Sequence, residues 1–581
     1  MMIPPMFEKI RCNVRGNVVI IVLLTLVAFA SRMPLMSISL GEVDAGNFCN
    51  ALLHGFDIES FRPHAPGYPI YIFLTWVLNN MLSDCLVSQT LVSSFLGSLV
   101  IIPFYLLVKD MTGSITAIFG SLLLIVNPLH WSFSEAALSD VPSTFFVVLA
   151  GYLAYRGRHC DWSFFASCAV LCVAIGVRPA NVSLLTLLAF PIISRTVVEH
   201  RFPIRTTLVG SLVFACVLSA WLIPSIYLGS GGIEAFGSAL HKQWVNAVSV
   251  GDISRLETPW VVGLFYRTER FALGYLLLYS WTATDTKTLG SLLFVTPWII
   301  GFLAFIWQFS LKNPRHLFLG LWLIAICYPI WSIHFLPRYG LPYMPAFLIA
   351  SLLGWQYVFV RMTAHRRRFE VFSIFALASV LVLYLVKLQP PVNSFEVNPP
   401  QMAGYLGLLG CLSVILIIWL VIRDRTTELF LGKRHFSFMK RRERFQVYLV
   451  YAALMVFLIP YAVLGYKTAS LGSRNMSPAD ELVAYVSETY SPGQTRVCWD
   501  NQTHSLFEAM APQFVLQGQR SADDLYSSYS SNRILIMTDR CRWLEEMDET
   551  LDVRYIDSYS GESPIWAKAP LLQAYEILPG Q

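Results

Sequence analysis

A short polar stretch between two long apolar runs holds most of the residues that could do chemistry. It covers Gly41 to Tyr71, and its ionisable side chains include Glu42, Asp44, Asp57, Glu59, Arg62 and His64. Ionisable groups beside a lipid bilayer are costly, so they are usually kept where they bind or react with something. This stretch is therefore the expected place of the chemistry.

Asp44 is the leading candidate for a catalytic base. It follows the first apolar run by a few residues, and the small residues Ala45 and Gly46 leave room around its carboxylate. A carboxylate in that position could take a proton from an acceptor hydroxyl or amine. The alternative is a helix N-cap, because aspartate is favoured there and the following segment has a helical pattern.

The second element is the sequence RPHAPGYP, residues 62–69. Its three prolines and one glycine predict a tight, non-helical turn. Arg62, His64 and Tyr68 would then be presented from a rigid backbone, which suits the binding of a charged head group. An interfacial turn with Tyr68 in the aromatic belt is the alternative.

Charged residues at the ends of other apolar runs extend the candidate site. Arg178 lies where two short runs meet, and Arg338 lies in the sequence HFLPRYGLP. A phosphate partner would explain both, because a guanidinium stays charged and can bind two oxygens; arginines that extend to a lipid boundary are the alternative. Glu135 and Asp140 flank a turn and are either acidic support for the site or helix caps.

Membrane helices must position these residues, as the composition indicates. The chain has 581 residues, of which 55% are hydrophobic and 14% charged, whereas soluble domains have about 25% charged residues. Apolar runs of about 20 residues predict about 13 membrane helices. They are expected near residues 18–36, 85–108, 113–130, 141–156, 161–177, 180–195, 206–228, 286–310, 316–334, 341–360, 371–389, 402–422 and 446–465.

Basic residues fall on alternate loops, which predicts the orientation of the chain. Lys9, Arg11 and Arg15 precede the first run, and the strongest basic cluster covers residues 423–444. By the positive-inside rule the N-terminus is cytoplasmic. With an odd number of spans, the C-terminus and the Gly41–Tyr71 stretch lie outside the cytoplasm. The first run lacks an evident cleavage site, so it is expected to stay as a span.

The sequence changes character after residue 465. Residues 496–500, 514–517, 534–538 and 553–556 read as strands, with helical segments between them. The alternation predicts a small extracytoplasmic α/β domain with a largely parallel sheet. The expected division is therefore a membrane domain over 1–465, with a catalytic first outer loop over 37–84, and a second domain over 466–581.

The eleven cysteines show no CxxC pair and no metal-ligand spacing. Most are expected to be small buried residues, with Cys498 and Cys541 as the only plausible disulfide partners. No metal site is expected from this pattern.

The first outer loop resembles that of the C-type glycosyltransferase superfamily. The similarity rests on Asp44-Ala-Gly after the first span and on His64-Ala-Pro-Gly-Tyr-Pro69. The branch it resembles most is that of protein O-mannosyltransferases and lipid A aminoarabinose transferases, which is family 39-like. A bacterial group with Asp-Ser-Gly and His-Pro-Pro-Gly-Tyr-Pro signatures is also similar, and it implies location in the bacterial inner membrane.

The resemblance implies a polyprenyl-phosphate-linked sugar as donor, used outside the cytoplasm, with a lipid, glycan or protein as acceptor. Asp44 matches the position of the family's catalytic acidic residue. His64 matches the position where relatives have a basic or polar group near the donor phosphate. Arg338-Tyr339 resembles the family's Arg-Tyr element, which implies phosphate binding. Many relatives have Asp-Glu where this chain has Asp44-Ala45. We therefore expect a reaction without a cofactor or metal, unless Glu42 or Asp140 completes a pair that binds a divalent metal.

Two other classes of protein remain as alternatives. A polysaccharide polymerase or ligase that uses a lipid-linked oligosaccharide also has many spans and a large outer loop. A transporter or flippase of lipid-linked sugars also keeps charges near membrane ends, although it usually has ionisable residues at mid-span and repeated halves.

Overall fold

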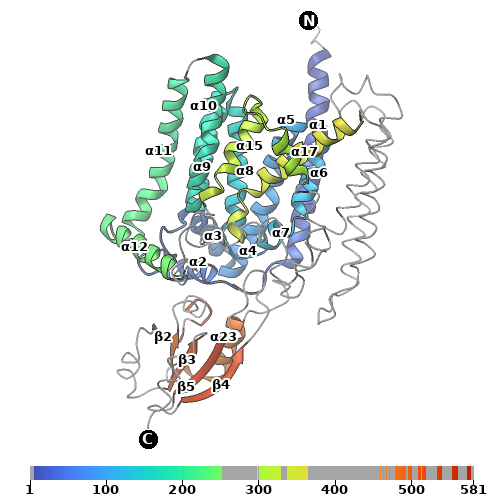
Figure 1. The fold of residues 1–581 in the computed structure, drawn as a ribbon. Helices are drawn as coiled ribbons and strands as arrows, with labels where there is room; N and C mark the ends of the chain where they lie inside the picture. The colour runs from blue at the N-terminus through green and yellow to red at the C-terminus, as the bar shows by residue number, and fades with distance from the viewer. Residues whose placement is uncertain are drawn as a thin grey trace.

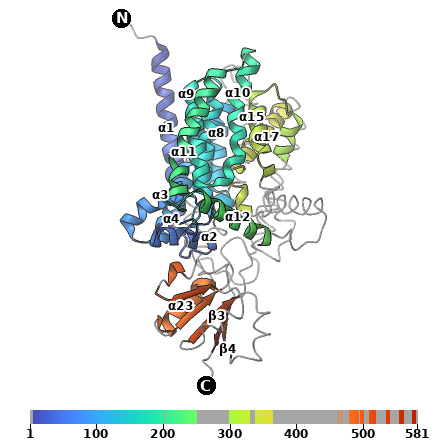
Figure 2. The same ribbon diagram turned by 90° about the vertical axis from the view of Figure 1, so that its left-hand side faces the viewer.

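The computed structural model describes a helical bundle and a small sheet. The described residues are 5–200, 202–250, 298, 300–328, 337–363, 458, 462, 466, 470, 478–492, 495–499, 508–511, 513–518, 533–538, 553–559 and 572–577. The N-terminal end of α1 (Pro5–Arg32) lies at one end of the bundle, and the sheet lies beyond the other end, as Figures 1 and 2 both show. The predicted spans at 371–389 and 402–422 lie outside these residues, so the count of about 13 stays a prediction.

The other described helices up to α12 follow one another closely, and residues outside the described ones separate α12 from α15. The helices after α1 are α2 (Val43–His54), α3 (Pro69–Leu82), α4 (Cys85–Leu99), α5 (Ile101–Thr112), α6 (Ser114–Ile125), α7 (Pro128–Phe133), α8 (Asp140–Gly157), α9 (Asp161–Val177), α10 (Thr186–Glu199), α11 (Ile204–Tyr227), α12 (Ile233–Val250), α15 (Pro314–Ile324) and α17 (Met344–Thr363). Short 3-10 helices are η1 (Met33–Leu35), η2 (Pro179–Leu185) and η4 (Pro337–Gly340).

Four described segments are long and apolar enough to cross a membrane: Asn17–Leu35, Cys85–Thr112, Pro179–Val197 and Ile204–Tyr227. Each overlaps a span expected from the sequence. The predicted span at 113–130 is instead divided into α6 and α7. The reason is local: Asn127 caps α7 by accepting a hydrogen bond from the backbone of His130, and Pro128 occupies the first turn.

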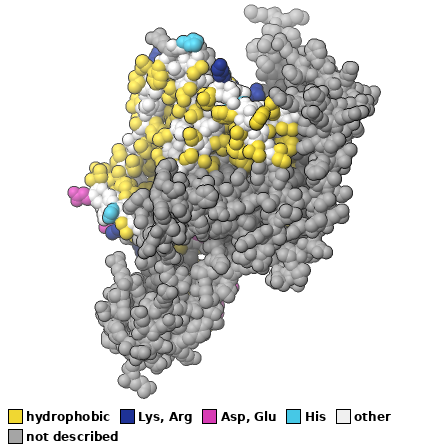
Figure 3. Space-filling model, viewed as in Figure 1, with side chains coloured by type: hydrophobic (Ala, Val, Ile, Leu, Met, Phe, Trp, Pro, Cys, Tyr) yellow, Lys and Arg dark blue, Asp and Glu magenta, His cyan; other side chains and the backbone are white. Residues whose placement is uncertain are grey.

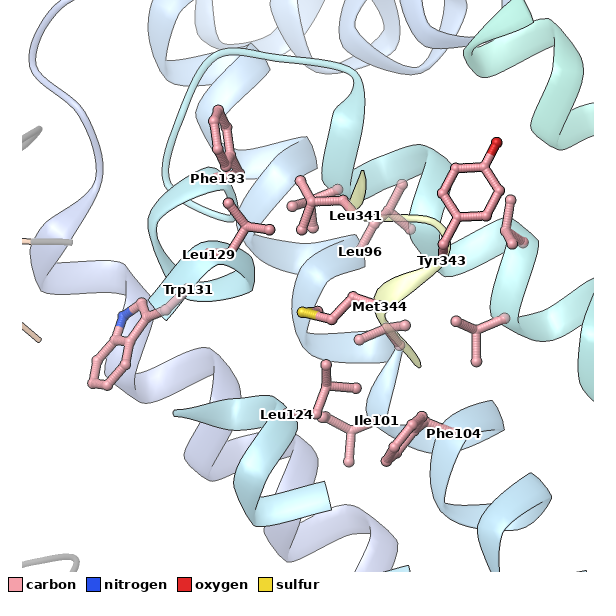
Figure 4. Packing of buried hydrophobic residues seen from close by; sticks show 14 of the residues in the cluster. Leu96, Ile101, Phe104, Leu124, Leu129, Trp131, Phe133, Leu341, Tyr343 and Met344 are labelled. Atoms are coloured by element: carbon pink, nitrogen blue, oxygen red, sulfur yellow. The ribbon is translucent and has the colours of Figure 1, made fainter. Parts of the chain in front are cut away.

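The core of the bundle packs the first spans against η4 and α17. Figure 4 shows Leu96 and Ile101 beside Leu341 and Met344, which come from opposite halves of the helical part. Trp322 on α15 is fully buried and donates its indole N–H to the carbonyl of Pro342 at 3.0 Å. This packing fixes the segment around η4 against the helices that follow the first outer loop.

The outer face of α11 is apolar. Leu208 and Leu212 are more than 60% exposed, and hydrophobic side chains gather over this part of the surface in Figure 3. A contiguous exposed apolar surface is costly in water. This face is suited to contact with lipid.

The C-terminal part forms a five-stranded mixed sheet with a helix. Its elements are α23 (Pro478–Thr489), β1 (Thr495–Trp499), β2 (Val515–Gly518), β3 (Arg533–Thr538), β4 (Val553–Tyr559) and β5 (Leu572–Ile577). The strand order is β2-β1-β3-β5-β4. In register, Val497 is opposite Leu516 on one side and Leu535 on the other.

The strands β1 to β4 overlap the four ranges expected from the sequence, but the sheet is not largely parallel. β1 runs parallel to β2 and β3, whereas β5 is antiparallel to both β3 and β4. β5 was not expected from the sequence, and its insertion between β3 and β4 makes the sheet mixed. A separate extracytoplasmic domain stays a prediction.

Candidate active site

The helix α2 holds Asp44 at the bundle end that faces the sheet (Figure 2). Asp44 is in the first turn, while Glu42 occupies the N-cap position and makes no capping hydrogen bond with its side chain. The N-cap alternative for Asp44 is therefore wrong. A carboxylate in the first turn interacts favourably with the helix dipole.

Arg338 brings the acidic residues together. Its Nη2 donates to Asp44 Oδ2 at 2.8 Å, and its Nη1 forms an ion pair with Glu42 Oε2. Its Nε lies 4.0 Å from Asp140 Oδ1. Burial lowers the pKa of Arg338, but the facing carboxylates outweigh burial and hold that pKa well above its usual value. Arg338 is thus a buried, permanently charged centre for three carboxylates.

Arg178 supplies a second buried cation. It lies between α9 and η2, because Pro179 prevents the helix from continuing. Its Nη1 is 3.0 Å from Asp140 Oδ2 and donates to Ser139 Oγ at 3.3 Å. The ring of Tyr339 lies next to both cations, with its centroid 4.9 Å from Arg178 Cζ and 5.8 Å from that of Arg338. The two arginines are thus neighbours of one aromatic ring.

His64 lies on the other side of Asp44. Its Nδ1 is 3.8 Å from Asp44 Oδ1, and its Nε2 is 3.2 Å from the hydroxyl of Tyr68. Phe48 on α2 packs against both rings, at centroid distances of 6.3 Å and 5.1 Å. Burial lowers the pKa of His64, more than Asp44 raises it. His64 is therefore neutral at pH 7 and can offer a hydrogen bond, not a charge.

The proline-rich turn has the non-helical backbone that the sequence predicts. The peptide bonds before Pro63 and Pro66 are cis. Gly67 has φ of +108° and Tyr68 has φ of +49°, a left-handed conformation that is uncommon for a tyrosine. Such conformations are kept where the surrounding structure over-determines them. The turn ends directly at α3. Within it, the rings of His64 and Tyr68 face Phe48 on α2.

Arg62 contacts a residue that sequence reasoning did not identify. Its Nη2 pairs with Oε1 of Glu508, whose Oε2 accepts a hydrogen bond from Asn50 at 3.3 Å. Nothing in the local sequence of Glu508 marks it, because its partners lie over 400 residues earlier in the chain. The predicted role of Arg62 in binding substrate stays a prediction.

Glu135 lies apart from this group. It is buried beside Trp131 and Arg32, and no arginine or lysine within the described segments forms an ion pair with it. Arg32 donates to the carbonyl of Ile125 at 3.0 Å and lies 3.3 Å from His130 Nδ1. Burial raises the pKa of Glu135 well above its usual value, although Arg32 and Trp131 oppose the change.

A disulfide joins Cys49 on α2 to Cys85 at the start of α4. The sequence-based expectation that Cys498 and Cys541 were the only plausible pair is therefore wrong. Two cysteines 36 residues apart carry no spacing signal, and only the fold brings them together. Cys541 lies outside the described residues.

Metal binding has limited support. In the part of the chain that the structure describes, no group of three or more His, Cys, Asp or Glu side chains is arranged to hold a metal ion. Glu42, Asp44 and Asp140 instead face the guanidinium of Arg338. The carboxylates that would ligate a metal are thus turned to a resident cation.

Comparison with solved structures identifies the fold. No protein-family model matches the sequence, and no curated protein matches it. The crystal structure of ArnT from Cupriavidus metallidurans in the apo state has a TM-score of 0.55 and 15% identity, and the match covers 97% of this chain and 98% of that one. The same protein bound to undecaprenyl phosphate has a TM-score of 0.54 and 14% identity, with the same coverage.

The oligosaccharyltransferase of Archaeoglobus fulgidus, tethered with an acceptor peptide, is also similar. Its TM-score is 0.53 at 12% identity, and the match covers 97% of this chain and 74% of that one. Both proteins are C-type membrane glycosyltransferases. The resemblance expected from the outer loop is confirmed at the level of the fold: this chain has the C-type glycosyltransferase fold over nearly its whole length.

Proposed function

We propose that the chain transfers a sugar from a polyprenyl-phosphate-linked donor to an acceptor on the extracytoplasmic side of the membrane. The observation that carries this is the convergence of Glu42, Asp44 and Asp140 on the buried Arg338, with Arg178 on the far side of Asp140. A carboxylate can remove a proton and two cations can stabilise a departing phosphate, so this site suits a reaction that needs both.

The chemical step is an inverting displacement at the anomeric carbon. The oxygen or nitrogen of the acceptor forms a bond to the anomeric carbon, and Asp44 takes the proton that this acceptor atom loses. The bond from carbon to phosphate oxygen breaks, and the electron pair leaves with the polyprenyl phosphate. Arg178 and Arg338 stabilise the negative charge that grows on the phosphate. His64 and Tyr68 are neutral hydrogen-bond groups near the donor.

Glu42 has a supporting role. It shares Arg338 with Asp44, and burial together with the nearby acids raises its pKa despite that arginine. A phosphate that enters the site competes with these carboxylates for Arg338. Among them, Glu42 can take up a proton and release the arginine without removing the charge of the base.

Two features support an extracytoplasmic site. The disulfide of Cys49 and Cys85 holds α2 to α4, and disulfides persist in oxidising compartments. The start of α1, where Lys9, Arg11 and Arg15 lie, is at the bundle end remote from α2 (Figure 1).

The solved relatives bear on the donor. ArnT was solved with bound undecaprenyl phosphate, which supports a polyprenyl-phosphate carrier for the donor of this chain. The similarity to an oligosaccharyltransferase favours a second candidate, in which a preassembled oligosaccharide is transferred. Offering the purified protein both donors, each radiolabelled, separates the two functions.

The test is transfer by purified protein in liposomes with a labelled polyprenyl-phosphate sugar. We expect Asp44→Asn to lower the rate by about 100-fold or more, because an amide cannot accept the proton. Glu59→Gln is the matched control, since Glu59 is an exposed acid of the same loop, and it should retain at least half of the rate. A chelator of divalent metals should leave the wild-type rate unchanged. Near wild-type turnover by Asp44→Asn would remove Asp44 from the mechanism.

A further inference from the structure

One carboxylate of the C-terminal part joins two separate elements of the first outer loop. Glu508 Oε2 accepts from Asn50 Nδ2 at 3.3 Å, and its Oε1 forms an ion pair with Arg62 Nη2. Asn50 lies on α2, the helix of Asp44, and Arg62 begins the proline-rich turn of His64. The side chains of Glu508 and Arg62 are 18% and 31% exposed, so the pair is partly shielded from water.

The same two elements also meet inside the loop. Phe48 on α2 packs on the rings of His64 and Tyr68. This contact is apolar and leaves the separation of Asp44 and His64 adjustable, whereas the Glu508 bridge fixes two further points through directional bonds. Two sets of contacts therefore keep His64 3.8 Å from Asp44: the packing of Phe48 and the bridge through Glu508.

A second contact joins the C-terminal part to the chain just before α2. Asp480, which is buried in the first turn of α23, accepts a hydrogen bond from the hydroxyl of Ser39. Ser39 precedes Glu42 by three residues. The C-terminal part therefore contacts the outer loop both before the start of α2 and near its end.

We infer that Glu508 is a positioning residue, which holds the proline-rich turn against α2 and thereby sets the place of His64 relative to Asp44. This rests on the function proposed above. Arg178 and Arg338, the proposed charged contacts of the donor phosphate, are held by other elements. A loosened turn should therefore displace α2 and His64 and slow the chemical step more than it weakens donor binding. Displacements of about 1 Å are enough to cost as much as 100-fold in rate.

The variants are Glu508→Ala and Glu508→Gln, with Glu488→Ala as control, because Glu488 is an exposed acid of α23. Two measurements are made on each: kcat and KM for the labelled donor in liposomes, and hydrogen exchange of residues 57–69. For Glu508→Ala we expect kcat to fall about tenfold with KM within twofold, and exchange in the turn to rise about tenfold. Glu508→Gln should be intermediate, since its amide oxygen still accepts from Asn50. Glu488→Ala should match the wild type throughout.

A double variant tests whether Glu508 acts through Arg62. Arg62→Ala with Glu508→Ala should be no slower in kcat than the slower single variant, because both remove the same bridge. Additive losses would overturn the inference. If Glu508→Ala does not fold, Glu508→Gln and Arg62→Lys provide the same comparison.

The two measurements keep the inference separate from the proposed function. Wild-type exchange in the turn of Glu508→Ala would overturn the positioning role whatever the transfer assay gives. A raised KM with unchanged kcat would also overturn it. If exchange is faster in Glu508→Ala but the wild type transfers no sugar, the positioning role of Glu508 stands and the proposed function is rejected.

Discussion

Asp140 and Glu135 are both buried acids of one short connection, yet their environments are opposite. Asp140 has Arg178 at 3.0 Å and Arg338 at 4.0 Å. Glu135 has Arg32 only as a more distant neighbour, and that arginine donates to backbone carbonyls. The comparison teaches that burial alone does not make a carboxylate useful for chemistry. Burial raises the pKa of both acids. Arg178 and Arg338 oppose this rise at Asp140, whereas Glu135 has only the more distant Arg32 and a pKa well above its usual value.

The largest effect is expected from the shared cation. Arg338→Gln leaves the partly exposed Glu42 and Asp44 without their arginine, so we expect transfer to fall by about 1,000-fold. The free energy of unfolding should fall by about 1–3 kcal/mol, because these carboxylates are only partly shielded from water. Transfer in liposomes and thermal unfolding in detergent measure the two effects.

Arg315→Gln is the control for Arg338→Gln, because Arg315 is exposed. Adding Glu42→Gln to Arg338→Gln should restore part of the lost stability and none of the transfer. A rate within threefold of wild type for Arg338→Gln would show that the network around this arginine does not serve the reaction.

A direct contrast of the two acids should give a smaller effect. Asp140→Asn deprives Arg178 of its ion pair and should lower transfer by about 100-fold, whereas Glu135→Gln should stay within about threefold. Both rates are measured with the same labelled donor. Equal losses in the two variants would mean that both acids belong to one functional cluster, and the contrast would fail.

The smallest effect is a pH dependence of stability. An unfolded glutamate loses its proton near pH 4.3, while folded Glu135, with its raised pKa, still holds one. Stability therefore falls as the pH rises above about 4.3, because the folded state binds more protons there. Glu135→Gln removes this loss, so its stability relative to wild type should increase between pH 5 and pH 8.

Thermal unfolding of both proteins at the two pH values measures this difference. Glu59→Gln, a change of an exposed acid, serves as the control. A constant difference for Glu135→Gln would show that folded Glu135 ionises like an exposed glutamate.

Much of the site was predictable because its residues lie at the ends of apolar runs. Asp44, Asp140, Arg178 and Arg338 were each singled out by charge next to an apolar segment, and charge alternation placed them on one side. Their pairing was not predictable. Helix packing decides that Arg338 reaches Asp44 across 294 residues of sequence, and no local pattern reports such a contact.

Other parts of the fold could not be predicted for related reasons. Glu135 and Asp140 were grouped by proximity in sequence, but the end of α7 and the start of α8 direct them to different neighbours. The Cys49–Cys85 bond and the role of Glu508 depend on tertiary contacts alone. β5 was missed, and without it the alternating strands and helices favoured a parallel sheet.

The buried Arg32 has a consequence for the order in which the chain assembles. Arg32 ends the first helix, but the carbonyl of Ile125 to which it donates is 93 residues later in the chain. During synthesis α1 thus emerges long before part of its hydrogen bonding exists, and a bare guanidinium cannot settle in hydrocarbon. Until α6 and α7 are made, the newly made α1 should keep this end at the membrane surface or within the insertion machinery. Its final depth in the bilayer is set by helices that enter after it.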